Sequence, residues 1–177
     1  MPTTRRAARL GAARPGATFL LNSPYGPDEV WDKIPREAQE QIIAKQLDVY
    51  IVDGHGVAES AGLGGRINTV LQTCFFALTG ILPQDEAISA IKGAIKKSYG
   101  RFGEAVLERN YAAVDAAIAA MHKLEVPATA TSDVHRRDGA GGHIQDVQLL
   151  LVLEHDPTGA CRRILHVVVP VGGDALG

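Results

Sequence analysis

The chain of 177 residues has few cysteines, no long apolar run and almost no net charge. Its two cysteines, Cys74 and Cys161, form no CxxC pair and no CxxCxxC run, so the chain cannot supply the ligands of a 4Fe–4S cluster. No apolar stretch approaches the roughly 18–20 residues that span a bilayer. The net charge of −2 argues against a nucleic-acid or anionic-membrane partner. Length and composition instead indicate one folded core, which we expect to be cytoplasmic.

Several motifs that carry catalysis or bind cofactors are also missing. Gly62–Gly65 is rich in glycine but lacks the GxGxxG spacing of a dinucleotide site, and the sequence contains no P-loop and no GxSxG elbow. The histidines show no metal-ligand spacing with carboxylates or thiolates. Asp53 and His55 follow an expected strand, where such a pair is more often a turn and a helix cap. We therefore assign no catalytic residue and no metal ligand.

The most informative stretch is Gly64–Thr79, in which an amphipathic helix follows a glycine pair. A helix N-terminus offers unpaired N–H groups and a partial positive charge, and Arg66 adds a fixed charge for a phosphate. The spacing alone also fits a core helix with an exposed arginine, so both interpretations stay open. Helical periodicity predicts one buried stripe made of Ile67, Val70, Leu71, Cys74, Phe75 and Leu78. A second face would carry Asn68, Gln72, Phe76 and Thr79.

Composition and periodicity divide the chain into three parts. Residues 1–17 are basic and aperiodic, and we expect a disordered leader there. Residues 18–127 alternate strand and helix patterns, which predicts an α/β fold: a partial layered domain with a short parallel-type sheet and several helices. Residues 128–177 contain a glycine-rich linker and then two apolar runs that predict a C-terminal β-hairpin, Val147–Leu153 and Ile164–Val169. The expected strands of the middle part are 18–21 and 47–52, and the expected helices are 28–33, 36–46, 56–61, 66–79, 84–99 and 101–123.

Three segments of the middle part carry a resemblance to a known family. They read TFLLNSPYGPDEVWDKIPREAQEQIIAKQLDVYIVD, GGRINTVLQTCFFALTGILPQDEAISAIKGAIKKSYG and ERNYAAVDAAI. In this order, over residues 18–127, they resemble part of pyruvate:ferredoxin (flavodoxin) oxidoreductase. The match falls in the gamma-type domain, which helps to hold coenzyme A in that family. Residues 128–177 do not resemble the sequence expected downstream, so we expect an unrelated tail.

The resemblance implies a role within a larger enzyme. Such an enzyme oxidatively decarboxylates pyruvate on thiamine diphosphate, passes electrons through 4Fe–4S clusters to ferredoxin or flavodoxin, and forms acetyl-coenzyme A. Thiamine and clusters would belong to the remaining domains or subunits, which would be the partners of this chain. Because the family's glycine-rich loop and lysine for coenzyme A precede the matching region, we expect weak coenzyme A contacts and no activity from this chain alone.

Two asparagines match positions that the resemblance implies contact coenzyme A, namely Asn68 and Asn110. Helix spacing separately turns Asn110 inward between Val106 and Val114, where a buried amide needs hydrogen-bond partners. That requirement is also met if Asn110 bonds a carbonyl inside the protein, so its role stays open from spacing alone.

Two other hypotheses for the whole chain remain. It could be a stand-alone α/β binding or interaction module, with the C-terminal hairpin offering an edge strand to a partner. It could also be an inactive truncated product.

Overall fold

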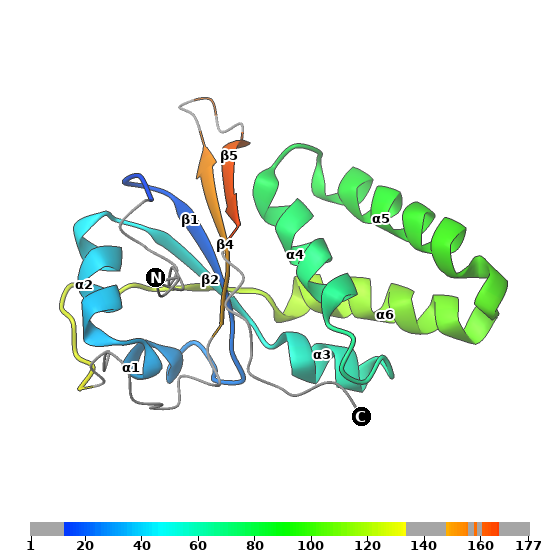
Figure 1. Ribbon diagram of the computed structural model, residues 1–177, viewed down its shortest axis with the longest axis horizontal. Helices are drawn as coiled ribbons and strands as arrows, with labels where there is room; N and C mark the ends of the chain where they lie inside the picture. The colour runs from blue at the N-terminus through cyan, green and yellow to red at the C-terminus, as the bar shows by residue number, and fades with distance from the viewer. Residues whose placement is uncertain (1–12, 134–147, 156–157, 159–160, 167–177) are drawn as a thin grey trace, which may run out of the picture.

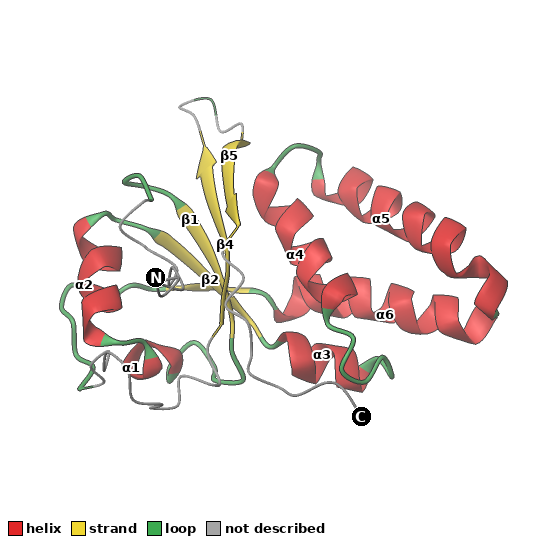
Figure 2. Cartoon of the chain, in the orientation of Figure 1, coloured by secondary structure: helices red, strands yellow, loops and turns green. Residues whose placement is uncertain are grey.

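The computed structural model describes residues 13–133, 148–155, 158 and 161–166. Within them a five-stranded sheet, in the order β3-β2-β1-β4-β5, stands between two groups of helices (Figures 1 and 2). Helices α1 (Val30–Lys33) and α2 (Arg36–Ala44) lie on one side of the sheet. Helices α3 (Gly54–Ser60), α4 (Asn68–Thr79) and α6 (Glu104–Ala120) lie on the other. The predicted α/β layered class is confirmed.

The sheet is mixed in strand direction. Its centre is the parallel pair of β1 (Thr18–Asn22) and β2 (Asp48–Val52), whose connection passes through α1 and α2. The antiparallel neighbours are β3 (His122–Leu124) beside β2 and β4 (Gln148–His155) beside β1, and β5 (Cys161–His166) pairs with β4. The β4–β5 pair confirms the predicted hairpin, although Val147 and residues 167–169 lie outside the described part of the chain.

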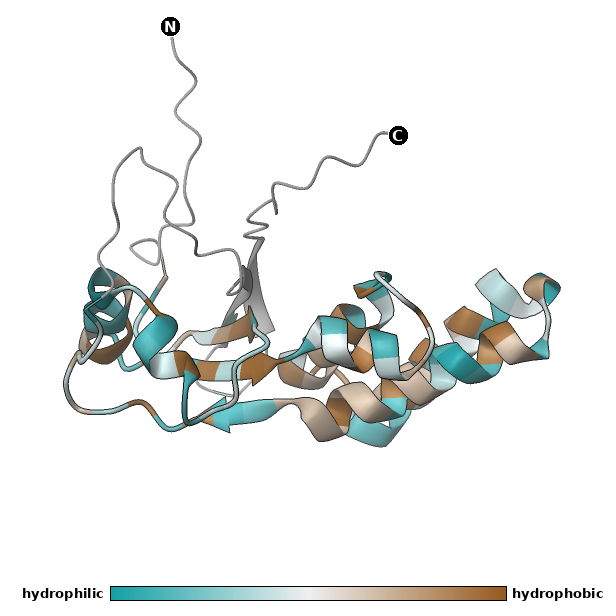
Figure 3. Cartoon of the chain, turned by 90° about the horizontal axis from the view of Figure 1, so that it is seen from below, coloured by the Kyte–Doolittle hydropathy of each residue, from teal (hydrophilic) through white to brown (hydrophobic). Residues whose placement is uncertain are grey.

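Side chains of the central strands contribute to two separate hydrophobic cores, one on each face of the sheet, because successive residues of a strand point to opposite faces. Phe19 and Leu21 pack with Val30, Trp31 and neighbours under α1 and α2. Leu20 and Val52 pack with α3, α4 and α6 on the other face. Both faces of β1 are therefore covered, which explains why its sequence, TFLLN, is apolar without a polar alternation. Figure 3 shows largely apolar central strands and helices that alternate apolar with polar positions.

Helix α5 (Gln84–Tyr99) forms an outer layer away from the sheet (Figure 1). Its Ile91 and Ile95 pack with Val114 of α6 in a third cluster, which also receives Phe76 of α4. A short 3₁₀ helix, η2 (Gly100–Phe102), and Gly103 at φ +100° turn the chain from α5 into α6. Gly80, in the left-handed conformation at φ +61°, ends α4.

The expected helix over 101–123 is too long at both ends. Helix α6 begins at Glu104 and ends at Ala120, and residues 122–124 instead form β3 against β2. Leu124 is buried in the α1–α2 core, and Lys123 pairs with Asp48 at 2.6 Å, an exposed contact that raises the pKa of the lysine through its hydrogen bond. Strand pairing, which periodicity within 101–123 cannot reveal, therefore decides where α6 ends.

Hydrogen bonds between residues far apart in the chain hold two segments against the rest of the domain, one that precedes β1 and one that follows β3. The side chain of Gln39, fully buried on α2, accepts hydrogen bonds from the backbone N–H groups of Thr131 (2.9 Å) and Ser132 (3.0 Å). Before β1, the backbone N–H of Arg14 donates to buried Glu154 of β4 at 3.1 Å. Within the described part of the expected leader, residues 13–17, Ala13 and Ala17 are buried.

Candidate functional site

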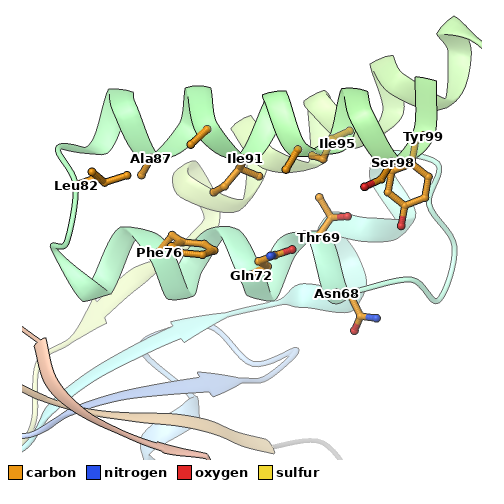
Figure 4. Close-up of a pocket in the computed structure, with 12 residues that line it drawn as sticks. Asn68, Thr69, Gln72, Phe76, Leu82, Ala87, Ile91, Ile95, Ser98 and Tyr99 are labelled. Carbon is orange, nitrogen blue, oxygen red and sulfur yellow. The ribbon is translucent and has the colours of Figure 1, made fainter. Parts of the chain in front are cut away.

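A groove of about 340 Å³ runs between α4 and α5 (Figure 4). Hydrophobic and small side chains form most of it, and a few polar side chains come from both helices. This mixture suits a ligand with an apolar body and a polar end. The residues that line it are Asn68, Thr69, Gln72, Phe76, Leu82, Ala87, Ala90, Ile91, Ala94, Ile95, Ser98 and Tyr99.

The groove exists because α4 has two different faces. All six residues of the predicted stripe, from Ile67 to Leu78, belong to the core between α4 and the sheet, so that prediction is confirmed. Asn68, Gln72 and Phe76 follow one another at a spacing of one turn on a second face, as predicted, and they line the groove. Thr79 does not: it is fully buried and donates its hydroxyl hydrogen to the carbonyl of Phe76.

The two ends of the groove differ in polarity (Figure 4). One end is apolar and lies between Phe76 and Leu82 with Ala87. At the other end, Thr69 of α4 faces Ser98 and Tyr99 of α5. A ligand lying along the groove would therefore meet hydroxyl groups at one end only.

Asn68 lies at the polar end, as the first residue of α4. Its side chain is exposed and its amide points away from α5 in Figure 4, so it lies at the mouth of the groove. The N-cap residue of α4, Ile67, has an apolar side chain and makes no capping hydrogen bond. The first N–H groups of that helix are thus available to a carbonyl or phosphate oxygen arriving beside Asn68.

Asn110 lies behind the groove wall and does not line it. Only 4% of the residue is exposed, and both ends of its amide are used inside the protein. Its Nδ2 donates to the carbonyl oxygen of Val106 at 2.8 Å, and its Oδ1 accepts a hydrogen bond from Thr69 Oγ1 at 3.0 Å. Thr69 itself lines the groove and lies between Asn110 and the groove, so of the two predicted asparagines only Asn68 lines it.

Sequence reasoning missed Thr69, Ser98 and Tyr99 as groove residues. Ser98 and Tyr99 could have been found from the sequence of α5. Ala87, Ile91, Ala94 and Ser98 recur at helical spacing along one side of that helix, which marks the side that faces the groove. No sequence pattern could have predicted the hydrogen bond between Thr69 and Asn110, because it joins residues 41 positions apart on two different helices.

The Asp53–His55 pair has the local role that its position suggested. Asp53 Oδ1 accepts a hydrogen bond from the backbone N–H of Gly56 at 2.8 Å and so caps α3. His55 is exposed. Across the described ranges, no three histidine, cysteine or acidic side chains gather into a group that could hold a metal ion. None of the helices in those ranges has both the length and the apolarity needed to cross a bilayer.

Cys74 is a buried residue of α4 whose thiol should be inert in the folded protein. Burial raises the pKa of this thiol to about 12, against an ordinary value of 9.0. In a Cys161→Ser background, we expect a thiol reagent at neutral pH to modify Cys74 only after denaturant is added. Rapid labelling of the native protein, followed by mass spectrometry, would contradict this burial.

The same shift predicts a loss of stability at alkaline pH. Between the unfolded and folded pKa values, the unfolded chain gives up the thiol proton while the folded chain keeps it, so the free energy of unfolding falls as pH rises above 9. The fall attributable to Cys74 should be roughly 1 kcal/mol per pH unit. Denaturant unfolding from pH 8 to 11, compared with Cys74→Ala, isolates this slope from that of other titrating groups.

The structure is therefore a mixed α/β domain with a partly polar groove, a class of structure in which small-molecule sites commonly occur. A family model described as pyruvate ferredoxin/flavodoxin oxidoreductase matches residues 2–120. Because this match covers most of the chain, the protein belongs to that family.

Individual relatives agree with the family match. The chain is 51% identical over 161 residues to the pyruvate-flavodoxin oxidoreductase of Trichormus variabilis, covering 91% of this chain and 13% of the relative. It is 47% identical over 122 residues to that of Rhodospirillum rubrum, covering 69% and 10%. It is 40% identical over 120 residues to the pyruvate:ferredoxin oxidoreductase of Moorella thermoacetica, covering 68% and 10%. The chain thus spans about a tenth of the length of these curated relatives.

Proposed function

We propose that this chain contributes coenzyme A contacts to a pyruvate:ferredoxin or pyruvate:flavodoxin oxidoreductase. The observation that carries the proposal is the α4–α5 groove, whose polar end begins at Asn68, in a chain of this family. Coenzyme A has phosphates and amides along a flexible arm, and the uncapped N-terminus of α4 offers N–H groups to such oxygens. Arg66, exposed just before α4, adds a positive charge for a phosphate.

The two asparagines have different parts in this proposal. Asn68 contacts coenzyme A directly, because it is exposed at the mouth of the groove. Asn110 acts through Thr69: by accepting the Thr69 hydroxyl hydrogen, it leaves that oxygen to act as an acceptor for a ligand in the groove. The chain would therefore orient a substrate and supply no acid, base or nucleophile of its own.

Binding by this chain alone should be weak. The groove is near the lower end of the ~300–1,000 Å³ found for pockets that bury drug-sized ligands. Coenzyme A is larger than such ligands, so most of it would remain outside. Association and ordering costs must be met before any affinity appears. The remaining domains of the enzyme, in the cytoplasm, would supply the other contacts, the thiamine diphosphate, the 4Fe–4S clusters and the route of electrons to ferredoxin or flavodoxin.

The proposal is tested by titrating coenzyme A into the chain, followed by calorimetry or by nuclear magnetic resonance. Asn68→Ala should weaken binding at least about threefold, the loss of one modest hydrogen bond. Gln84→Ala is the matched control, because Gln84 is an exposed amide on α5 outside the groove lining. Equal binding by wild type and Asn68→Ala would remove Asn68 from the site. No detectable binding by wild type would exclude the groove as a coenzyme A site.

A further inference from the structure

The helices that form the groove differ in charge from one end of the groove to the other. Helix α4 contains no charged residue, whereas α5 has Asp85 and Glu86 in its first turn and Lys96 and Lys97 in its last. The two helices run antiparallel, so the start of α4, which Arg66 precedes by two positions, lies beside the end of α5 (Figure 4). The polar end of the groove is therefore basic, and the apolar end is acidic.

Two cations stand at the rim of the basic end. Lys97 lies one helical turn after the groove residue Ala94. Arg101 lies one turn after the groove residue Ser98, in η2. Both cations are exposed. Neither of them, and not Arg66 either, forms an ion pair or a hydrogen bond with any residue that the structure describes. Their charges are thus available to a ligand.

Helix stability explains only part of this basic end. Lysines in the last turn of a helix interact favourably with its terminal carbonyl groups, which accounts for the two lysines of α5. It does not account for Arg66, because the N-terminus of a helix carries a partial charge of the same sign. It does not account for Arg101 either, since that residue follows α5. Elsewhere an exposed cation such as Lys92 has a carboxylate partner, Asp115.

We propose that coenzyme A lies along the groove in one direction, with its phosphates between Arg66 and Arg101 and its thiol at the end formed by Phe76 and Leu82. This inference rests on the proposed function and adds the direction of the ligand. Phosphates are attracted by the basic end and repelled by the two carboxylates at the start of α5. The pantetheine arm is uncharged and carries methyl groups, so it can occupy the apolar end. Lys97 and Arg101 then distinguish coenzyme A from thiols that lack its phosphates.

The direction also determines where the reactive sulfur leaves the chain. The thiol emerges beside the loop between α4 and α5, where Ile81 (61%) and Leu82 (41%) are exposed. The part of the oxidoreductase that transfers the acyl group must approach this loop, and in doing so it would cover these two apolar side chains.

The direction is tested by nuclear magnetic resonance of the isotope-labelled chain with coenzyme A that carries a nitroxide, joined to its sulfur through a thioether. The unpaired electron broadens nearby signals, so the amides of residues 81–87 should lose intensity while those of Asn68 and residues 98–101 keep most of theirs. The same ligand reduced with ascorbate is the reference. Stronger broadening at Asn68 and residues 98–101, or equal broadening at both ends, overturns the direction. If coenzyme A changes no signal in the groove, the proposed function fails, and the direction fails with it.

Charge variants test the phosphate contacts separately. Lys97→Gln and Arg101→Gln should each raise the dissociation constant of coenzyme A by roughly threefold at low salt, and the effect should shrink as salt is added. Neither variant should alter the signal changes caused by pantetheine, which has no phosphate. Lys33→Gln is the matched control, because Lys33 is an exposed lysine of α1 on the other side of the sheet. An equal loss in Lys33→Gln, or an equal loss of pantetheine binding, overturns the phosphate contacts.

Discussion

Replacing Gln39 with leucine should lower the free energy of unfolding by about 3 kcal/mol. Gln39 is fully buried, and its amide serves three backbone groups of two separate segments. Nε2 donates to the carbonyl of Trp31 at 2.6 Å, and Oε1 accepts from the N–H groups of Thr131 and Ser132. Leucine is close to glutamine in size, so the substitution leaves these groups unsatisfied without opening a cavity.

The matched control is the same substitution two positions along the same helix. The Oε1 atom of Gln41 is buried, and no hydrogen-bond partner for it is present among the described residues. Gln41→Leu removes a polar atom that gains nothing from its burial, so stability should change by less than about 0.5 kcal/mol or should rise. Denaturant unfolding of the two variants tests the difference. Equal losses would mean that leucine is simply tolerated poorly on α2.

Through Thr131 and Ser132, Gln39 also holds in place the segment that follows β3. Ser132 is held there by two more contacts: its Oγ donates to the carbonyl of Asp32, and its own carbonyl accepts from Arg36. Loss of the Gln39 amide should loosen this segment before the whole domain unfolds. Limited proteolysis of Gln39→Leu should therefore cut near residues 128–133 faster than in Gln41→Leu, under conditions where both remain folded.

The parts of this fold that the sequence predicts well are those with a strong local pattern. The bounds of α5, Gln84–Tyr99, were predicted to the residue, because Pro83 and Gly100 frame a regular apolar spacing. The buried stripe of α4 was equally clear. The start of α4 was predicted two residues too early. Gly62 and Gly64 adopt positive φ values, and the turn that they form makes the helix begin at Asn68 instead of Arg66.

What periodicity misses are contacts between distant segments. The hairpin was predicted from its two apolar runs, but its place beside β1 depends on pairing across about 130 residues. The same holds for β3: its first two residues, His122 and Lys123, were predicted as the end of a helix, and pairing with β2 makes them a strand. In the candidate site, sequence reasoning proposed Asn68 and Asn110 as contacts to the same ligand, and only the packing of α4 against α6 reveals that Asn110 bonds Thr69 and does not line the groove.

The second large effect expected is at Asn110, where a double-mutant cycle with Thr69 can separate stability from binding. Asn110→Ala should lower the free energy of unfolding by about 2 kcal/mol, because it leaves the buried partners of a 4%-exposed amide unpaired. Thr69→Val removes the hydroxyl while keeping the shape, and should cost about 1 kcal/mol. The double variant should lose less than the sum, with a coupling of at least about 0.5 kcal/mol.

The same cycle, measured by coenzyme A binding, tests whether Asn110 acts through Thr69. If it does, Asn110→Ala weakens binding in the wild-type background and adds nothing once Thr69 is valine. Asn68→Ala is the matched asparagine control: it is exposed, so it should leave stability unchanged, and its effect on binding should add to that of Asn110→Ala. A further loss of binding by Asn110→Ala in the Thr69→Val background would show that Asn110 reaches coenzyme A by another route.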